Sequence, residues 1–274
     1  HKLVRFLSSF IQDKTTMKSF INISLTLTSL LLASTANAAN CLEGCPTGLN
    51  NGKTIERSIY TLKNNRYTKF ADWVAYQVTP NTMSGPSRSR SWKSDPDLYS
   101  HYTLEPSDYT DAYATINTDR GHQVPLASFS NTADWRLTNL LSNITPQSSA
   151  LNQGPWVRLE TAVRNHVDDG NNLYVVTGPM YEYYFADLPR ANENHTIPSG
   201  YFKIVMKQSG NTIKASAFIM QQSAGRRDNF CNTQVSIDEV ESRTGINVLP
   251  NLTSNQAQTI ESSVFGLASE LGCN

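Results

Sequence analysis

The chain has 274 residues, of which 17% are charged, and its formal net charge at pH 7 is zero. This length is enough for one sizeable domain with a hydrophobic core. A protein that coats nucleic acid by electrostatic attraction carries a marked basic excess. The balanced charge excludes that class, so any polyanion would have to be bound by a local basic cluster and a metal ion.

The first 38 residues have the layout of a secretory leader. Met17 and Lys18 precede an apolar stretch at residues 20–33, and Ala36-Asn37-Ala38 forms an A-x-A cleavage site. The stretch is short and rich in Ser, Thr and Asn for a membrane anchor. We predict an upstream segment of open status at 1–16, a signal peptide at 17–38 and a single domain at 39–274. That domain would be secreted or periplasmic, with no membrane contact after cleavage.

Four cysteines follow the leader: Cys41, Cys45, Cys231 and Cys273. An even number in an exported chain indicates disulfides, and four cysteines allow three connectivities. We favour Cys41–Cys45, which closes a tight N-terminal loop, with Cys231–Cys273, which ties back the C-terminus. A zinc site of four thiolates is the alternative, but the short C-x-x-C spacing typical of such sites is missing.

The first half of the predicted domain alternates strands and loops. Residues 55–62 and 73–79 mix apolar, aromatic and β-branched side chains and predict strands. Residues 80–108 are rich in Pro, Ser, Asp and Gly and predict a long surface loop, a kind of segment that is often functional. Residues 111–118 form another strand-like run.

Apolar residues recur at helical spacing over residues 150–168 and predict an amphipathic helix that ends at Gly170. They are Trp156, Leu159, Val163 and Val167. Pro155 is a poor residue for a helix interior. It marks either the first turn of the helix or a distortion of that turn.

The remaining segments predict strands and two further helices. Strands are predicted at residues 173–178, 201–207 and 212–220. Gly210 indicates a hairpin between the last two. Ser236 and Glu239 form a capping box for a short helix that stops at Gly245, and residues 255–271 predict a final helix. The whole is a mostly antiparallel sheet flanked by helices, an α+β fold.

The segment Asp119-Arg120-Gly121-His122 points most directly to chemistry. Phosphodiester hydrolysis needs a nucleophile made from water, and a neutral imidazole takes up that proton near physiological pH. A histidine alone is more often an ordinary core or surface residue. Here Asp119 could hold the ring or the local turn, Arg120 could bind an anion, and Gly121 permits close backbone approach. We therefore predict His122 as the general base.

Asn152 and Glu160 are predicted to serve a metal ion. Mg²⁺ prefers oxygen ligands, keeps several waters and often has one or two protein ligands. Asn152 could be a direct ligand, and Glu160 could hold metal-bound water from the same helix. The alternatives are a helix N-cap for Asn152 and a solvated carboxylate, paired with Arg164 at i+4, for Glu160. Both interpretations of Glu160 hold if Arg164 orients it.

Arg90 and Arg120 are predicted to stabilise the charge that develops on the phosphate oxygens, which a guanidinium fork matches in geometry. Arg88 competes with Arg90 for this role. Asn143 lies in an Asn-Ile-Thr glycosylation pattern, but a turn-forming or ligand-positioning amide is the interpretation we favour.

Together these segments closely resemble the DNA/RNA non-specific endonuclease family, in particular its secreted Serratia-type members. The similarity extends over essentially all of residues 39–274. The matching segments lie at residues 68–76, 90–93, 119–127, 141–147, 151–160 and 176–179, and the cysteine placement matches as well.

The resemblance implies a ββα-metal core with His122 as general base and Asn152 as direct Mg²⁺ ligand, with Mn²⁺ as the alternative metal ion. It implies that Glu160 holds metal-bound water, that Arg90 and Arg120 bind the scissile phosphate, and that Asn143 positions the site. Family members cut DNA and RNA to 5′-phosphorylated products, and secreted members are often homodimers.

Two other functions stay open at the level of sequence. One is a non-catalytic exported DNA-binding protein on the same scaffold, and the other is a metal-dependent hydrolase of a different phosphodiester. A pure binder would not need the combination of His122, Asn152 and Glu160. The arginine-bearing loop favours a polymeric substrate over a small one.

Overall fold

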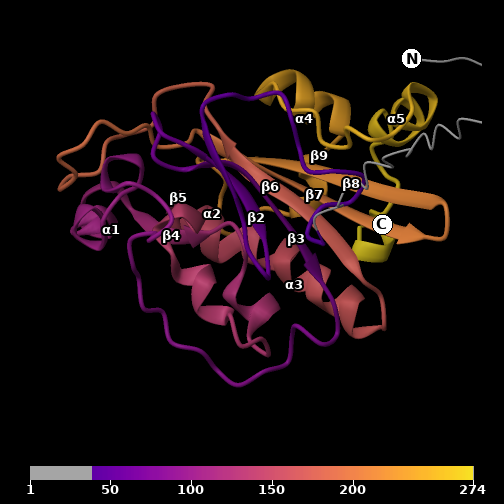
Figure 1. The fold of residues 1–274 in the computed structure, drawn as a ribbon, viewed down its shortest axis with the longest axis horizontal. Helices are drawn as coiled ribbons and strands as arrows, with labels where there is room; N and C mark the ends of the chain where they lie inside the picture. Colours follow the sequence, from indigo (N-terminus) through magenta and orange to yellow (C-terminus); the bar gives the residue numbers. More distant parts are fainter. Residues whose placement is uncertain (1–38, 274) are drawn as a thin grey trace, which may run out of the picture. The chain divides into compact units, whose positions relative to one another are not determined.

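A computed structural model describes residues 39–273. The predicted upstream segment and signal peptide lie outside these residues. A seven-stranded sheet runs in the order β1-β2-β3-β6-β7-β8-β9, and every neighbouring pair is antiparallel (Figure 1). The strands are β1 (Gly52–Glu56), β2 (Thr61–Asn65), β3 (Ala71–Val78), β6 (Leu173–Met180), β7 (Gly200–Ser209), β8 (Thr212–Gln221) and β9 (Gln234–Val235).

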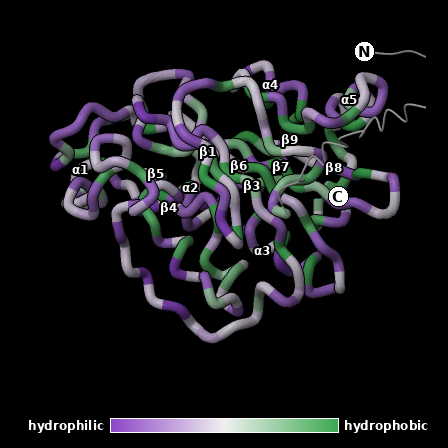
Figure 2. The backbone as a smooth tube through the Cα atoms, in the orientation of Figure 1, coloured by the Kyte–Doolittle hydropathy of each residue, from purple (hydrophilic) through white to green (hydrophobic). Residues whose placement is uncertain are grey.

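Helices cover both faces of this sheet, α3 (Val157–Asp168) on one side and α4 (Ile237–Thr244) and α5 (Ser254–Glu261) on the other (Figure 1). Side chains alternate between faces along a strand. In β3, Tyr76 therefore joins the core beneath α3, whereas Trp73 joins the core beneath α4. Figure 2 shows the central strands as the hydrophobic middle of the fold. The predicted α+β class with a mostly antiparallel sheet is confirmed.

A separate two-stranded ribbon, β4 (Thr118–His122) with β5 (Ile144–Ser148), leads into α3 and forms a β-β-α unit. Gly121 allows the two strands to pack closely, because a Cβ there would lie 2.5 Å from Gln147 Oε1. The unit lies within residues 79–172, which leave the sheet after Val78 and return at Leu173. These two residues are paired in the β3–β6 ladder.

The helix predicted over residues 150–168 is interrupted. A single turn, α2 (Ser149–Leu151), is followed by a π-helical segment at Asn152–Trp156 and then by α3. Pro155 has no amide hydrogen to donate, and Gly154 adopts φ −116° and ψ −118°, outside the helical region. The distorted first turn is thus the alternative that the structure shows. π-Bulges often occur at functional sites because they re-aim side chains.

The strand predicted at residues 111–118 is wrong. Residues Ala112–Ile116 form a short helix, α1, and only Thr118 belongs to β4. Asp111 and Asn117 flank the helix in the left-handed region, with φ of 62° and 54°. Asn and Asp tolerate that conformation, so they close the helix at both ends despite the β-branched residues near its C-terminus.

The predicted strand at 55–62 is two strands joined by a turn in which Arg57 N donates to Tyr60 O. The buried ion pair of Arg57 with Asp95, at 2.6 Å, holds that turn. The helix predicted over 255–271 ends at Glu261, and a 3₁₀ turn follows at Ser269–Leu271. Further 3₁₀ turns lie at Ser100–Tyr102, Pro106–Tyr109, Leu126–Phe129, Trp135–Asn139, Leu141–Asn143 and Phe230–Thr233.

Two local predictions in the C-terminal half are confirmed. The β7–β8 hairpin turns at Gly210, whose φ is +59°. Helix α4 begins with Ser236 Oγ accepting from Glu239 N at 3.1 Å and ends at Gly245, with φ +77°.

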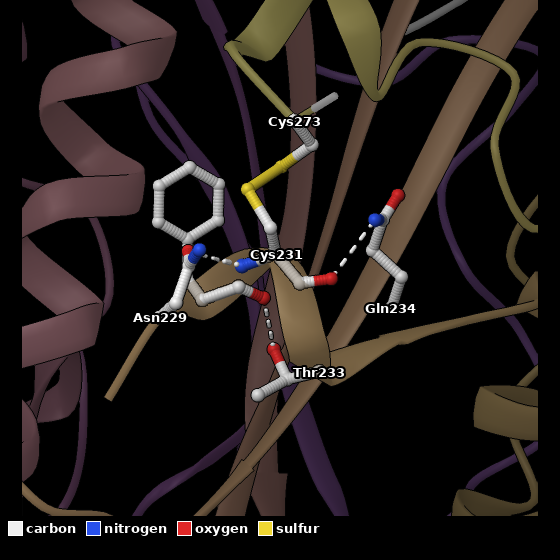
Figure 3. The surroundings of a disulfide bond; sticks show 6 residues. Asn229, Cys231, Thr233, Gln234 and Cys273 are labelled. Atoms are coloured by element: carbon white, nitrogen blue, oxygen red, sulfur yellow. Dashed lines mark hydrogen bonds between the residues drawn. A yellow bond between two sulfur atoms is a disulfide. The ribbon is translucent and has the colours of Figure 1, made fainter.

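The structure contains the disulfides Cys41–Cys45 and Cys231–Cys273. The second joins the C-terminal segment to the 3₁₀ turn after β8, where Asn229 Oδ1 accepts from Cys231 N at 3.0 Å (Figure 3). The C-terminus is thereby attached to the edge of the sheet. In residues 39–273, no helix is both long and apolar enough to cross a bilayer.

Candidate active site

A cleft of about 1000 Å³ opens beside the β-β-α unit, on the α3 side of the sheet. Its walls come from the loop after β3, from residues 109–114 around α1, from the ribbon strand β4 with residues 125–127 after it, and from the helical region that starts at residue 149. Of the predicted site residues, it brings together Arg90, Arg120, His122, Asn152, Glu160 and Arg164.

The side-chain amide of Asn139 holds the ring of His122 on one side. Asn139 is buried, and its Nδ2 donates to Ser89 O at 3.1 Å, so its Oδ1 faces the ring. That oxygen accepts from His122 Nε2 at 3.2 Å. Because an amide oxygen only accepts, Nε2 carries the hydrogen in the neutral ring, and Nδ1 keeps its lone pair.

The surroundings of His122 favour its neutral form. Burial lowers the pKa of His122 to about 4, and the positive charge of Arg90 acts in the same direction, against the bond to Asn139, which raises it. The indole of Trp92 lies with its centroid 5.3 Å from the imidazole. The imidazole is thus an unprotonated proton acceptor at neutral pH.

Asp119 holds the amide of Asn152. Its two oxygens accept hydrogen bonds from Ser149 Oγ, Asn152 Nδ2 and Gln153 Nε2, each at 2.8 Å. The bond from Nδ2 turns the Asn152 side chain so that Oδ1 is its uncommitted end, and no donor reaches that oxygen within residues 39–273. The N-cap alternative for Asn152 is wrong, since it lies inside the helical region and makes no capping bond.

Glu160 lines the same cleft from the first turn of α3. Burial raises its pKa, while the charges of Lys203 and Arg164 oppose that rise. No ion pair joins Glu160 to Arg164 within the described part of the chain. Arg164 Nη2 instead donates to Thr161 Oγ1 at 2.9 Å. The predicted i+4 pair is therefore replaced by a longer-range attraction.

Lys203 is the unexpected member of this region. It is fully buried in β7, on the face that packs under α3. Its Nζ lies 4.4 Å from the centroid of the Trp156 ring and 3.4 Å from Tyr76 Oη. Burial lowers its pKa to about 8, and the charge of Glu160 opposes that shift. Lys203 supplies positive charge behind Glu160 without entering the cleft.

Arg90 and Arg120 differ in how firmly they are held. Arg120 lies over the rings of Trp92 and Tyr109, at 5.8 and 5.3 Å, and its Nη2 donates to Pro106 O at 3.2 Å. Arg90 is exposed at the cleft wall. Its competitor Arg88 points elsewhere, because its Nε donates to Ser130 O at 2.8 Å. The geometry favours Arg90.

Asn143 is the predicted site residue that the cleft does not include. It is fully buried, and its side chain cross-links the chain just after His122. Oδ1 accepts from Val124 N at 2.9 Å, and Nδ2 donates to Val124 O and to Thr138 O. Asn143 therefore fixes the backbone just after His122 and does not line the cleft.

Sequence reasoning missed Asn139, Lys203 and the exposed aromatic Tyr113, which lines the cleft from α1. The sequence did contain a pattern that indicates a buried Lys203. Lys203 lies two residues from Tyr201 and two from Val205 on a predicted strand, so it had to share a face with these apolar residues. Asn139 carried none, because only the tertiary fold brings it to His122.

The donor set suits a hard divalent cation. The uncommitted amide oxygen of Asn152 and the carboxylate of Glu160 are oxygen ligands, and no sulfur ligand shares the cleft within residues 39–273. Two protein oxygens with room for water in a large cleft match the coordination that Mg²⁺ prefers.

Comparisons with known proteins agree with this geometry. The family model for DNA/RNA non-specific endonucleases matches residues 37–255. The chain is 42% identical over 263 residues to a nuclease of Serratia marcescens, covering 93% of this chain and 98% of that one. It is 27% identical over 222 residues to human mitochondrial endonuclease G, covering 72% of this chain and 69% of the relative.

Among solved structures, the chain is similar to a structure of EndoG in complex with its inhibitor EndoGI. The TM-score is 0.65 at 20% identity, over 78% of this chain and 91% of that one. This likeness supports the ββα-metal fold alone. The match of the family model over most of the chain, together with the Serratia relative, shows that the chain belongs to the DNA/RNA non-specific endonuclease family, whose members are typically metal-dependent.

Proposed function

We propose that this protein is an exported, Mg²⁺-dependent endonuclease that hydrolyses phosphodiester bonds of both DNA and RNA. The observation that carries the proposal is the single cleft in which an unprotonated imidazole, an oriented amide oxygen, a carboxylate and two guanidinium groups face one another. Each of these groups has a part in cutting a phosphodiester.

His122 is the general base. With Nε2 committed to Asn139, Nδ1 accepts the proton of the attacking water. The water oxygen bonds to phosphorus as the bond to the 3′-oxygen breaks. The departing 3′-oxygen takes a proton from solvent water, which leaves a 5′-phosphate on one product and a 3′-hydroxyl on the other. Asn143 keeps His122 in place through the Val124 backbone.

Asn152 would hold the metal ion directly, and Glu160 would hold it through water. A bound Mg²⁺ or Mn²⁺ supplies charge neutralisation at the phosphate and at the departing oxygen. Asp119 orients the Asn152 amide, and the charges of Lys203 and Arg164 favour the carboxylate form of Glu160 against the rise in its pKa that burial causes. The residues therefore supply hard oxygen ligands in a fixed orientation.

Arg90 and Arg120 bind the non-bridging oxygens of the scissile phosphate and the charge that develops there. These contacts are to the backbone of the nucleic acid and carry no base information. Weak sequence preference and activity on both polymers follow from such contacts. Two disulfides are typical of proteins outside the reducing cytoplasm, which supports secretion or periplasmic export; a homodimer is the proposed assembly.

The decisive experiment is cleavage of plasmid DNA and of RNA with Mg²⁺, with excess EDTA, and by His122→Ala. We expect the wild type to cut both polymers only with the metal ion, and the folded variant to lose nearly all activity while still binding DNA. Cleavage that persists in EDTA would contradict metal dependence. An inert wild type that binds DNA would identify a binding protein.

A further inference from the structure

Helices α4 and α5 lie on the face of the sheet opposite α3 (Figure 1), and three of their carboxylates lie close together. Asp238 and Glu241 are three positions apart in α4 and so project from the same side of that helix. Glu261 is the last residue of α5. One oxygen from each of the three lies within 4.8 Å of the other two.

Glu261 is what distinguishes this cluster from an ordinary acidic surface. It is only 8% exposed, and within residues 39–273 its carboxylate takes part in no hydrogen bond or ion pair. Its oxygen faces the two other carboxylates. Three ionised carboxylates this close repel one another, and a bound cation would relieve that repulsion.

The neighbouring groups do not provide that positive charge. Glu241 Oε1 accepts from Val248 N at 2.7 Å, which fixes the side chain and leaves Oε2 available. Arg243, the basic residue in the last turn of α4, is engaged by Glu182 and Glu239. Without a cation, burial and the charges of Glu241 and Asp238 raise the pKa of Glu261 to about 7.

We propose that Asp238, Glu241 and Glu261 form a second divalent-cation site, separate from the cleft, that binds Ca²⁺. Three carboxylates and no nitrogen or sulfur ligand suit a hard cation. Ca²⁺ accepts carboxylates in one- or two-oxygen modes with flexible geometry, whereas Mg²⁺ demands a tighter octahedron. An affinity on the order of 10⁻⁴ M would match sites in extracellular modules.

The site would stabilise the fold without taking part in cleavage. Helix α5 is short and mostly exposed, and Ile260 is its main contact with the core under α4. A cation shared by both helices would fasten α5 to α4. Ligand binding to the native state alone raises the unfolding temperature as the ligand concentration rises.

The test uses the full chain with Asn152→Ala, which removes the proposed metal ligand of the cleft. We expect calorimetry to show one equivalent of Ca²⁺ bound to this variant, with a concentration-dependent rise in Tm. Both effects should disappear when Glu261→Gln or Asp238→Asn is added. Glu239→Gln, an exposed acid of the same helix outside the cluster, should leave them intact.

Two outcomes would overturn the proposal. One is that Asn152→Ala binds no Ca²⁺. The other is that binding and the Tm rise persist unchanged in both double variants. Asp238 is exposed, so Asp238→Asn keeps the test decisive if Glu261→Gln fails to fold.

Discussion

Asp119 Oδ2 accepts a hydrogen bond of 2.8 Å from Asn152 Nδ2, so a carboxylate on the ribbon strand determines which atom of the amide is presented to the cleft. The two residues are 33 positions apart, and the π-helical segment brings them together. Groups that orient a metal ligand typically change metal affinity or activity by roughly 10- to 100-fold when they are altered.

Replacing Asp119 with Asn should therefore raise the Mg²⁺ concentration needed for half-maximal cleavage by roughly 10- to 100-fold. The amide nitrogen of the variant cannot accept a hydrogen bond, whereas Asn152 Nδ2 needs an acceptor at this position. Metal titrations of the cleavage rate measure the effect. Ser149→Ala is the control, because it removes one bond to the same carboxylate and leaves Asn152 held. An unchanged metal requirement in folded Asp119→Asn would contradict this role.

The acid limit of activity should lie well below the usual range of histidine. The general base works when neutral, so activity is present above the pKa of His122 and is lost as the pH falls through it. That pKa is lowered to about 4, which predicts an acid limb of kcat/KM near the same pH.

Arg90→Gln provides the check on this assignment, because the charge of Arg90 helps to lower the pKa of His122. The variant should move the acid limb toward higher pH, independently of how much it slows cleavage. An acid limb that stays in place would assign it to another group, such as Glu160.

Lys203→Met should affect activity more than stability. The charge of Lys203 opposes the rise in the pKa of Glu160 that burial causes, so its removal should raise that pKa further. The acid limb of the pH–rate profile should therefore move to higher pH. Met also avoids the cost of burying an ammonium ion, which offsets the loss of the attraction between Lys203 and Glu160. pH–rate profiles and thermal unfolding separate the two effects. Lys207→Met, on the same strand but paired with Glu270, should leave the profile unchanged.

The two disulfides should contribute unequally to stability. Cys231 and Cys273 are separated by 42 residues, and Cys41 and Cys45 by 4. In the chain-entropy model these loops correspond to roughly 4 and 2 kcal/mol of unfolding free energy. Denaturant unfolding of the two paired Cys→Ser variants measures the difference. Equal losses would show that the longer loop is already restricted in the unfolded chain.

The sequence predicts the fold best where local and global signals agree. The hairpin at Gly210 and the capped helix that starts after Ser236 need only a few adjacent residues, and both were predicted correctly. Residues 111–118 were predicted wrongly because β-branched residues near the end of the run outweighed two residues able to adopt positive φ. Propensity alone could not reveal that Asp111 and Asn117 would do so.

In the candidate site, too, the sequence predicts some residues and only the tertiary structure reveals the others. Its reactive groups stand in readable motifs, so the sequence identifies His122, Asn152 and Glu160, which line one cleft, although it does not predict the strand that carries His122. Their supports are set by tertiary packing. The contact of Asn139 with His122 and the position of Lys203 behind Glu160 depend on how the ribbon and α3 pack on the sheet.

The pairing of Val78 with Leu173 bears on how the protein folds. Every wall of the cleft belongs to the segment between these two residues, so the cleft closes only when strands far apart in the chain come into register. Closing so long a loop has an entropic cost that local hairpins do not carry. Until β3 and β6 pair, the chain carries all the reactive groups but not the arrangement that brings them to one cleft, so we expect catalytic competence to appear with global folding and not before it.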